Sequence, residues 1–296
     1  MPHFDLAKML GHIATFRITK LFVVPPILVL LSKHPLARGA DLSSLRMVAS
    51  GAAPLAKEIQ REVSKLMPEG YEDKVRQGWG MTEVTCTALG WDPTTSAVAG
   101  VGELMPDCKA KLLSIDSGEE IVEPDMPGEL YISAPTMMKG YWRNPEATRN
   151  AITVDTAGTR WLRTGDIAYV GPEYETGTLF HIVDRAKELI KVKGYQVSPS
   201  ELDALLLERE DVMDAAVVGV AINGEELPRA YIVPKPGFAH IKGTEIQEWV
   251  AQRVAHYKRL KGGVVFVEAI PKNPVCPLHP QTWRFFIANI RRPARS

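Results

Sequence analysis

One stretch of seven residues combines groups that could contact a planar ring, a phosphate and a cation. Residues 77–83 read Gln-Gly-Trp-Gly-Met-Thr-Glu. Gly78 and Gly80 let the backbone bend around a ring, and Trp79 between them offers an aromatic face for stacking. Thr82 supplies a hydroxyl for a phosphate oxygen. Glu83 supplies a hard oxygen ligand for Mg²⁺, whose other ligands would be phosphates and water. The structural alternative is a glycine-rich turn around a core tryptophan.

A second stretch carries opposite charges that could contact a sugar phosphate. Residues 163–166 read Arg-Thr-Gly-Asp, a turn sequence that leaves the carboxylate of Asp166 projecting from a loop. That carboxylate could accept hydrogen bonds from two vicinal hydroxyls. Beyond an intervening strand, Arg185 adds a cationic fork suited to a ribose or a phosphate. Taken alone, each charge is better explained as a solvated surface group, so the interpretation depends on their order along the chain.

A hairpin and a helix are predicted in the sequence that follows Arg185. Residues 190–194 alternate apolar and basic side chains and end on glycine, which predicts a strand edge closing on a tight turn at Lys193 and Gly194. Ser198 then begins a Ser-Pro-Ser-Glu sequence that predicts a capped amphipathic helix through Leu202. Without other context this is a basic hairpin followed by a helix.

A further predicted strand, at residues 47–50, leads into small residues. Gly51, Ala52 and Ala53 would let a ligand approach the backbone closely, and Pro54 favours the start of a helix. A tight strand-to-helix turn is the better interpretation of these residues alone.

The order of these segments resembles the adenylate-forming (AMP-binding) enzymes, most closely the 4-coumarate–CoA ligase and firefly-luciferase-like branch of the acyl-CoA synthetases. The resemblance covers about residues 4–273, and its strongest segments are 163–166 and 184–201. It implies a two-step ligase, in which a carboxylic acid reacts with ATP to give an acyl-adenylate and the thiol of coenzyme A then displaces AMP. The implied cofactors and co-substrates are ATP or AMP, Mg²⁺ and coenzyme A.

The resemblance also implies roles for individual residues. Thr82, Glu83 and Lys193 are the expected catalytic residues, and Glu83 is the expected Mg²⁺ ligand. The family usually has tyrosine where this chain has Trp79, a change that keeps the stacking face and loses the phenolic hydroxyl. The residues expected to contact the nucleotide are Gly51, Ala52, Ala53, Gly78, Trp79, Gly80, Thr82, Asp166, Arg185 and Gln196.

For the thioester step, the resemblance implies a rotation of a small C-terminal domain. Lys187 falls at the expected hinge. Lys193, Gly194 and Gln196 belong to the loop that this rotation would bring into the site.

The expected fold is mixed α/β and α+β. It comprises the C-terminal portion of an adenylate-forming large domain, with a partial α/β layer and a small β-barrel, followed by a small α+β domain. Tyr141 and Trp142 are expected to pack the barrel, and Thr244 is expected to cap a helix. The remnant of the large domain is expected over residues 1–186, with the α/β layer over 1–99 and the barrel over 100–186. The small domain is expected over 187–274, and a divergent tail over 275–296.

The composition and charge of the chain limit the classes of binding partner that the sequence supports. The 296 residues carry 35 basic and 35 acidic side chains, which gives no support to a nucleic-acid partner or a polybasic membrane contact. The longest apolar run, residues 21–31, is too short to span a bilayer. Three widely spaced cysteines favour a reducing compartment. Met1 begins no secretory signal, so we expect a cytoplasmic or peroxisomal location, although the chain has no recognisable peroxisomal C-terminal tripeptide.

Three functions remain open. The first is an acyl- or aryl-CoA ligase acting on a small carboxylic acid, which Lys187 and the residues 191–196 favour. The second is an adenylating enzyme that loads a carrier protein. The third is a non-catalytic fragment from a misassembled gene.

We expect the chain as written to be inactive or impaired in adenylate formation. The sequence contains no Ser/Thr/Gly-rich phosphate loop, so it resembles an N-terminally truncated member of the family. The resemblance also stops after Pro274, where the family places a catalytic lysine in a Ser-Gly-Lys turn. No lysine follows Lys272.

Overall fold

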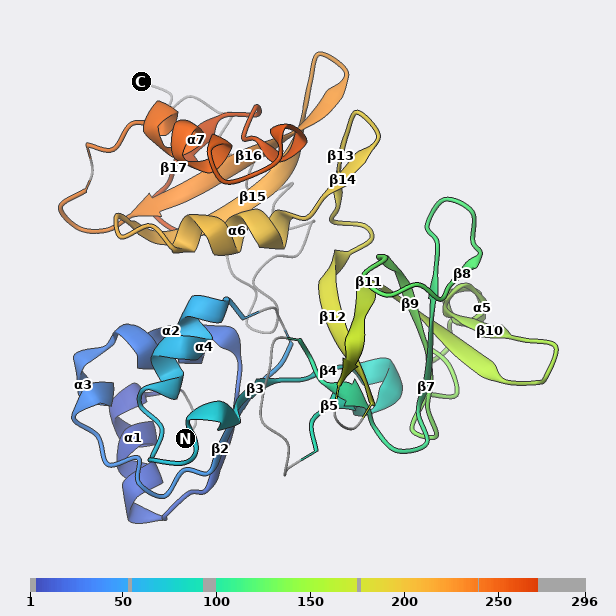
Figure 1. Cartoon of the computed structure of the whole chain (residues 1–296), viewed down its shortest axis with the longest axis horizontal. Coiled ribbons are helices and arrows are strands. Elements are labelled where there is room, and N and C mark those ends of the chain that lie inside the picture. The colour runs from blue at the N-terminus through green and yellow to red at the C-terminus, as the bar shows by residue number, and fades with distance from the viewer. Residues whose placement is uncertain (1–3, 53–54, 93–99, 175–176, 239, 271–296) are drawn as a thin grey trace. The chain divides into compact units, whose positions relative to one another are not determined.

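The computed structural model describes residues 4–52, 55–92, 100–174, 177–238 and 240–270 (Figure 1). The chain divides into two compact units, Met1–Ile182 and Val183–Ser296. The division falls inside one strand, and each unit has a hydrophobic core of its own. None of the helices in the described part of the chain combines the length and the hydrophobicity that a membrane-spanning segment requires.

The first unit begins with helices packed on a three-stranded parallel sheet of order β1-β2-β3. Asp5 caps the first helix by accepting a hydrogen bond from the backbone N–H of Lys8 at 3.0 Å. The elements are α1 (Leu6–Thr15), β1 (Lys20–Val23), α2 (Pro25–Lys33), α3 (Pro35–Arg38), β2 (Met47–Ser50), α4 (Lys57–Ser64), the 3₁₀ helix η1 (Glu72–Lys74) and β3 (Val75–Gln77).

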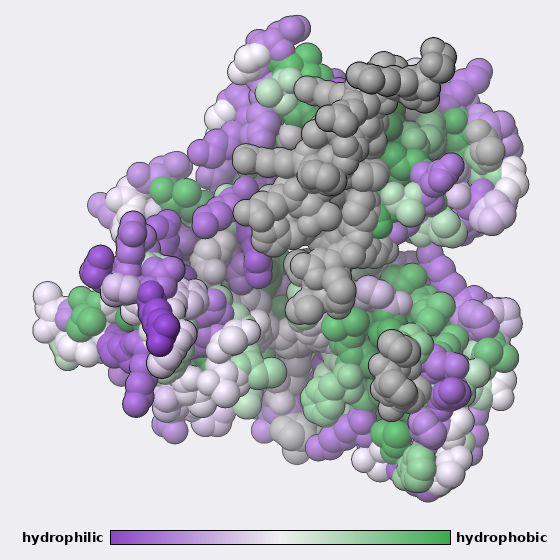
Figure 2. All heavy atoms as spheres, turned by 180° about the vertical axis from the view of Figure 1, so that it is seen from behind, coloured by the Kyte–Doolittle hydropathy of each residue, from purple (hydrophilic) through white to green (hydrophobic). Residues whose placement is uncertain are grey.

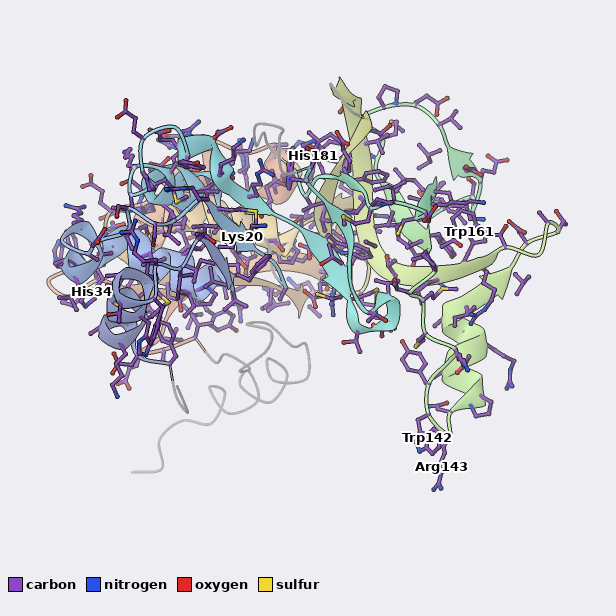
Figure 3. All side chains as sticks on the ribbon, turned by 90° about the horizontal axis from the view of Figure 1, so that it is seen from below. Lys20, His34, Trp142, Arg143, Trp161 and His181 are labelled. Atoms are coloured by element: carbon purple, nitrogen blue, oxygen red, sulfur yellow. The ribbon has the colours of Figure 1, made fainter. Side chains whose placement is uncertain are left out.

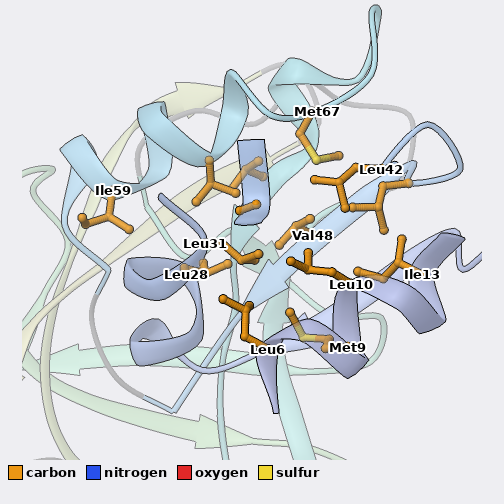
Figure 4. Packing of buried hydrophobic residues seen from close by; sticks show 14 of the residues in the cluster. Leu6, Met9, Leu10, Ile13, Leu28, Leu31, Leu42, Val48, Ile59 and Met67 are labelled. Carbon is orange, nitrogen blue, oxygen red and sulfur yellow. The ribbon is translucent and has the colours of Figure 1, made fainter. Parts of the chain in front are cut away.

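One face of this sheet is buried and the other carries exposed apolar groups. Val48 of β2 packs with Leu10, Ile13, Leu28 and other helix residues in one continuous core (Figure 4). On the opposite face of β1, Phe22 is exposed. Hydrophobic side chains are visible on the surface of this region of the first unit in Figure 2. The residues therefore form the expected partial α/β layer, with helices on the face that holds the core.

A small antiparallel sheet of order β4-β5-β6 follows (β4 Trp79–Met81, β5 Cys86–Gly90, β6 Glu103–Leu104). The 3₁₀ helix η2 (Thr82–Val84) joins its first two strands. A Cβ atom on Gly80 would lie 1.5 Å from the carbonyl oxygen of Cys86 in β5. Glycine is required at position 80 because the two strands approach so closely.

The rest of the first unit is a curled, half-barrel sheet of order β10-β11-β9-β7-β8, with β12 paired to β11. This curled, half-barrel sheet confirms the expected partial barrel. Its register shifts between Arg163 and Ile167 of β11, where the chain leaves the ladder with β9. The elements are β7 (Lys109–Leu113), β8 (Glu120–Ile121), β9 (Gly128–Ser133), α5 (Pro145–Ala151), β10 (Ile152–Val154), β11 (Arg160–Tyr174) and β12 (Gly177–Arg185).

The expectation that Tyr141 and Trp142 pack this barrel is wrong. Trp142 is 87% exposed and Tyr141 is 37% exposed. Both residues lie in the loop before α5, and Figure 3 shows Trp142 and Arg143 projecting at its outer end. Their aromatic character led to the error, because it predicts burial only when a strand or helix turns the ring inward.

The second unit is a compact α+β domain. A short hairpin precedes a three-stranded sheet of order β15-β16-β17, and α6 packs against β15. The expected cap at Ser198 is confirmed, whereas α7 begins after Lys242 and takes no side-chain cap from Thr244. The elements are β13 (Ile190–Val192), β14 (Tyr195–Val197), α6 (Pro199–Leu207), β15 (Val212–Ile222), β16 (Glu225–Pro234), α7 (Gly243–Ala251), the 3₁₀ helix η3 (His256–Lys258) and β17 (Val264–Phe266).

Candidate functional site

Two predicted site residues from distant regions of the sequence form a direct contact in the first unit. The indole Nε1 of Trp79 donates a hydrogen bond to Oδ2 of Asp166 at 2.8 Å. Both side chains are buried. Trp79 begins β4 and Asp166 lies in β11, so the contact joins two different sheets. The indole therefore fixes the carboxylate through its polar edge, while stacking of its face on adenine stays a prediction.

The backbone around Asp166 explains why its side chain leaves the ladder. Gly165 has φ +74°, in the left-handed region that favours glycine. The hydroxyl of Thr164 accepts a hydrogen bond from the backbone N–H of Asp166 at 3.1 Å and donates one to the carbonyl of Leu130 at 2.7 Å. The Thr-Gly-Asp turn predicted from sequence is thus a short irregularity inside β11, anchored on β9.

Arg163, the first residue of this motif, is engaged by a partner that sequence reasoning missed. Its guanidinium forms two hydrogen bonds with the buried carboxylate of Glu129 in β9, at 2.7 and 2.8 Å. The bonded carboxylate raises the pKa of the Arg163 guanidinium. This two-point pair is a structural link between neighbouring strands, and it holds the start of the irregularity that carries Asp166.

Glu83, the predicted metal ligand, is half-buried on η2. Its Oε1 accepts a hydrogen bond from the phenol of Tyr141 at 2.7 Å. Burial and the Glu83 carboxylate raise the pKa of Tyr141 to about 12, so the phenol is a neutral donor at physiological pH. Thr82 beside Glu83 is exposed. The predicted Thr-Glu pair is therefore presented together on one 3₁₀ turn.

The small-residue segment lies next to the start of this region. Gly51 follows the end of β2, and the backbone N–H of Gly78 donates to the carbonyl of Ser50 at 2.9 Å. A Cβ on Gly51 would lie 3.6 Å from the Gly78 carbonyl oxygen, so the two predicted glycines are neighbours. Ala52 has φ +71° and is exposed. Ala53 lies outside the described residues.

The remaining predicted site residues belong to the second unit. Arg185, at the end of β12, and Gln196, in β14, are exposed. Asp184, next to Arg185, is buried and accepts hydrogen bonds from the hydroxyls of Ser198 and Ser200 at 2.6 and 2.8 Å. This carboxylate ties the end of β12 to the first turn of α6.

Lys187 lies in a single turn between these anchored elements. The backbone N–H groups of Glu188 and Leu189 both donate to the carbonyl of Arg185, at 2.9 and 3.2 Å. Lys187 is exposed and lies close to the start of the second unit at Val183. The turn is short and flanked by fixed residues, and the role of Lys187 as a hinge stays a prediction.

The hairpin predicted around Lys193 is confirmed. Lys193 and Gly194 have φ +48° and +87° and join β13 to β14 as a two-residue loop. The Lys193 ammonium lies 3.3 Å from Oε1 of Glu225, in a pair whose side chains are both largely exposed. Below the loop, Tyr195 stacks on Tyr257 with ring centroids 4.3 Å apart. The hairpin is thus attached to η3 through this aromatic pair.

The structure therefore brings together two subsets of the predicted residues in the first unit. The first is Trp79 with Asp166, and the second is Gly51 with Gly78. The contacts that sequence reasoning missed are those of Glu129 and Tyr141 and, in the second unit, those of the Ser198 and Ser200 hydroxyls with Asp184. No local pattern signals these partners, because each contact joins residues that are far apart in the chain.

Comparison with protein families gives two matches along the chain. Residues 1–142 match the family model described as AMP-binding enzyme, and residues 201–275 match the AMP-binding enzyme C-terminal domain. 4-coumarate–CoA ligase 2 of Oryza sativa subsp. japonica is 40% identical over 279 residues, which cover 92% of this chain and 47% of that protein. The acyl-CoA synthetase ACTT5 of Alternaria alternata is 39% identical, over 93% of this chain and 46% of that protein. The chain spans about half the length of the curated relatives it matches.

Solved structures with the same architecture give a consistent result. ATP-bound MatB from Rhodopseudomonas palustris matches 99% of this chain with a TM-score of 0.84 and 27% identity, and the match covers 55% of that chain. The amide bond synthetase McbA from Marinactinospora thermotolerans matches 97% of this chain with a TM-score of 0.81 and 29% identity, covering 56% of that chain.

Proposed function

We infer that this chain binds the adenosine moiety of ATP in its first unit. The reason is that the chain belongs to the AMP-binding enzymes and to their 4-coumarate–CoA ligase and acyl-CoA synthetase branch. We further infer that its function is that of an ATP-dependent ligase, which activates an acyl or aryl carboxylic acid and transfers the acyl group to coenzyme A. The observation that carries the proposal is the hydrogen bond between Trp79 and Asp166.

This contact suits ribose recognition. A carboxylate has two oxygens and about four lone-pair sites, so Asp166 can accept the indole N–H and further donors at the same time. Because the indole, the Thr164 hydroxyl and the turn at Gly165 hold Asp166 in place, little side-chain entropy is lost when a ribose binds. Two vicinal hydroxyls can donate to one fixed carboxylate, which would orient the nucleotide.

The residues around Glu83 fit a Mg²⁺ ion that is held mainly by phosphate and water. Among the described residues there is no group of three or more His, Cys, Asp or Glu side chains that could hold a metal. Glu83 would therefore be a single carboxylate ligand, as is usual for Mg²⁺ bound together with a nucleotide. When bound, the ion would neutralise negative charge that develops on the phosphates. Thr82 would donate its hydroxyl to a phosphate oxygen.

In the second unit, we propose Lys187 as the hinge and the hairpin around Lys193 as the loop of the thioester step. The Lys193-Gly194 loop is exposed, and its two-residue geometry holds the Lys193 backbone in one conformation. A cation presented this way could stabilise negative charge when a thiolate attacks the acyl-adenylate. Arg185 and Gln196 are exposed and could contact the nucleotide.

Calorimetric titration with AMP tests the nucleotide site directly. We expect the wild-type chain to bind AMP and to lose affinity for 2′-deoxy-AMP and 3′-deoxy-AMP, which each lack one hydroxyl. Asp166→Asn should weaken AMP binding by about tenfold or more, because it replaces hydrogen bonds to a charged acceptor. It should also reduce the difference between AMP and the deoxy nucleotides.

The matched control is Asp116→Asn, which changes an exposed aspartate in the turn between β7 and β8. This variant should bind AMP as the wild type does. The ribose assignment is wrong if Asp166→Asn and Asp116→Asn bind all three nucleotides equally well.

A second measurement separates the acceptor thiols. Pre-formed acyl-adenylate is offered to the chain with either coenzyme A or a carrier protein bearing phosphopantetheine. Faster thioester formation with coenzyme A supports the ligase proposal, and faster loading of the carrier protein contradicts it. Lys193→Ala reports whether the hairpin contributes to this step.

A further inference from the structure

The hydrogen bond between Tyr141 and Glu83 involves only one of the two oxygens of the Glu83 carboxylate. The phenol donates to Oε1 of Glu83 at 2.7 Å. The structure gives Oε2 of Glu83 no hydrogen bond or ion pair with any described residue. The phenol therefore uses one lone-pair site of Oε1 and weakens this oxygen as a ligand, whereas Oε2 is available to a cation with its full acceptor capacity.

The loop that carries Tyr141 is itself anchored. The backbone N–H of Tyr141 donates to the hydroxyl of Thr148 at 2.9 Å, and that hydroxyl donates to the carbonyl of Asn144 at 2.9 Å. A Cβ on Gly140 would lie 2.8 Å from the Thr148 side chain, so glycine allows this close approach. The side chain of Asn144 caps α5 by accepting from the N–H of Ala147 at 3.0 Å. The position of the phenol is thus fixed relative to α5.

The same loop also holds the backbone on which Glu83 lies. The backbone N–H of Met138 donates to the carbonyl of Glu83 at 2.7 Å. The Thr85 hydroxyl donates to the carbonyl of Thr136, and the Thr136 hydroxyl donates to the carbonyl of Val84, both at 2.8 Å. Because these three bonds fix the main chain, the Tyr141–Glu83 bond restrains the freedom that remains, which is rotation about the side-chain torsions of Glu83.

We propose that Tyr141 is a positioning residue that makes Glu83 a one-oxygen ligand and thereby selects Mg²⁺ over Ca²⁺. Ca²⁺ takes six to eight oxygens in flexible geometry and often binds both oxygens of a carboxylate, whereas Mg²⁺ requires near-octahedral geometry and takes one. Because the phenol already draws on Oε1, Oε2 is the stronger donor to a cation, and coordination through one oxygen suits the smaller ion. This inference rests on the proposed function, since the cation would arrive with the nucleotide.

The experiment measures the affinity of the full chain for ATP by calorimetry, with Mg²⁺, with Ca²⁺ and with EDTA. The wild type should bind ATP more tightly with Mg²⁺ than with Ca²⁺. Tyr141→Phe should weaken the Mg²⁺-dependent affinity by about tenfold to a hundredfold, the usual effect of removing a group that orients a metal ligand. Affinity with Ca²⁺ should be unchanged or increased, because the released carboxylate can bind through both oxygens.

Two further variants distinguish positioning from general damage. Tyr131→Phe removes a phenol from β9 of the same unit and should keep the wild-type preference for Mg²⁺. Glu83→Gln should remove the cation dependence, and adding Tyr141→Phe to it should cause no further change. AMP binding without metal should be the same in all these chains, which reports that the nucleoside site is intact.

The possible results lead to different conclusions. A wild-type preference for Mg²⁺ that is retained in Tyr141→Phe overturns the role of Tyr141. If AMP binds but the affinity for ATP does not depend on the cation, the inference is overturned. The proposed nucleoside site is then still supported. If neither nucleotide binds, the proposed function fails and the inference fails with it.

Discussion

The segment at residues 79–83 in the first unit and the hairpin at residues 193–196 in the second hold their candidate groups by different means. Trp79 and Glu83 are fixed by side-chain partners 87 and 58 residues away in the sequence. Lys193 is fixed by its own two-residue turn and by one exposed ion pair. The first segment depends on tertiary structure, so mutations at its distant partners should affect it. The second depends on local backbone conformation, so mutations in the turn itself should affect it.

The largest effect should come from the close approach inside the first segment. Gly80→Ala places a Cβ 1.5 Å from the Cys86 carbonyl oxygen, so β4 and β5 must separate. We expect a loss of about 3 kcal/mol in the free energy of unfolding. Urea denaturation measures it, with Gly39→Ala as the control, because a Cβ on Gly39 meets no atom within 4 Å. Equal stability of the two variants would show that the strands can move apart at little cost.

The next effect tests the distant partner of Asp166. Trp79→Phe keeps an aromatic ring and removes the indole N–H, which leaves a buried carboxylate without that donor. We expect a loss of about 2 kcal/mol in stability, together with weaker AMP binding. In an Asp166→Asn background the effect of Trp79→Phe should shrink, and a double-mutant cycle measures the coupling. Additive effects would mean that the two side chains act independently.

A smaller effect is expected in the hairpin. Gly194 has φ +87° with open space around it, so Gly194→Ala should cost about 1 kcal/mol through backbone conformation alone. Gly194→Asn should cost less, because asparagine tolerates this region better. Amide hydrogen exchange should show faster exchange in β13 and β14 and unchanged exchange in β4 and β5. A change that spread to the first unit would contradict the local character of the hairpin.

The smallest effect should follow loss of the exposed ion pair. Lys193 and Glu225 have side chains that are 65% and 47% exposed, so Lys193→Ala should change stability by less than about 0.5 kcal/mol. Thermal unfolding measures it, with Glu225→Ala as the matched variant. A large loss in either variant would place the hairpin in the same class as the first segment.

The same contrast explains what the sequence could predict. The turn at Lys193 and Gly194 and the caps at Asp5 and Ser198 follow from adjacent residues, and all three are present. Asn223 and Gly224 carry an equally strong hairpin signal, with φ +51° and +82° between β15 and β16. That signal was available in the sequence and would have joined these two strands.

The partners of the candidate site could not be predicted in this way. Tyr141 belongs to an aromatic pair whose composition favours burial, yet its ring is partly exposed and its hydroxyl reaches Glu83. Glu129 occupies an alternating strand in which any carboxylate would be expected to face solvent, yet it is buried against Arg163. Both outcomes depend on which distant segments of the chain become neighbours in the fold, and adjacent residues in the sequence carry no information about that.

The exposure of Trp142 has a consequence for fluorescence spectroscopy. Its indole is 87% exposed beside the Arg143 guanidinium, whereas Trp79 and Trp161 are buried. Among the tryptophans of the described residues, iodide, an anionic quencher, should therefore reach Trp142 first, and the emission of Trp142 overlaps that of the indole that contacts Asp166. A Trp142→Phe chain would remove this solvent-quenched component without altering β4 or β11. In that background, a nucleotide-dependent change in emission would report more directly on the environment of Trp79.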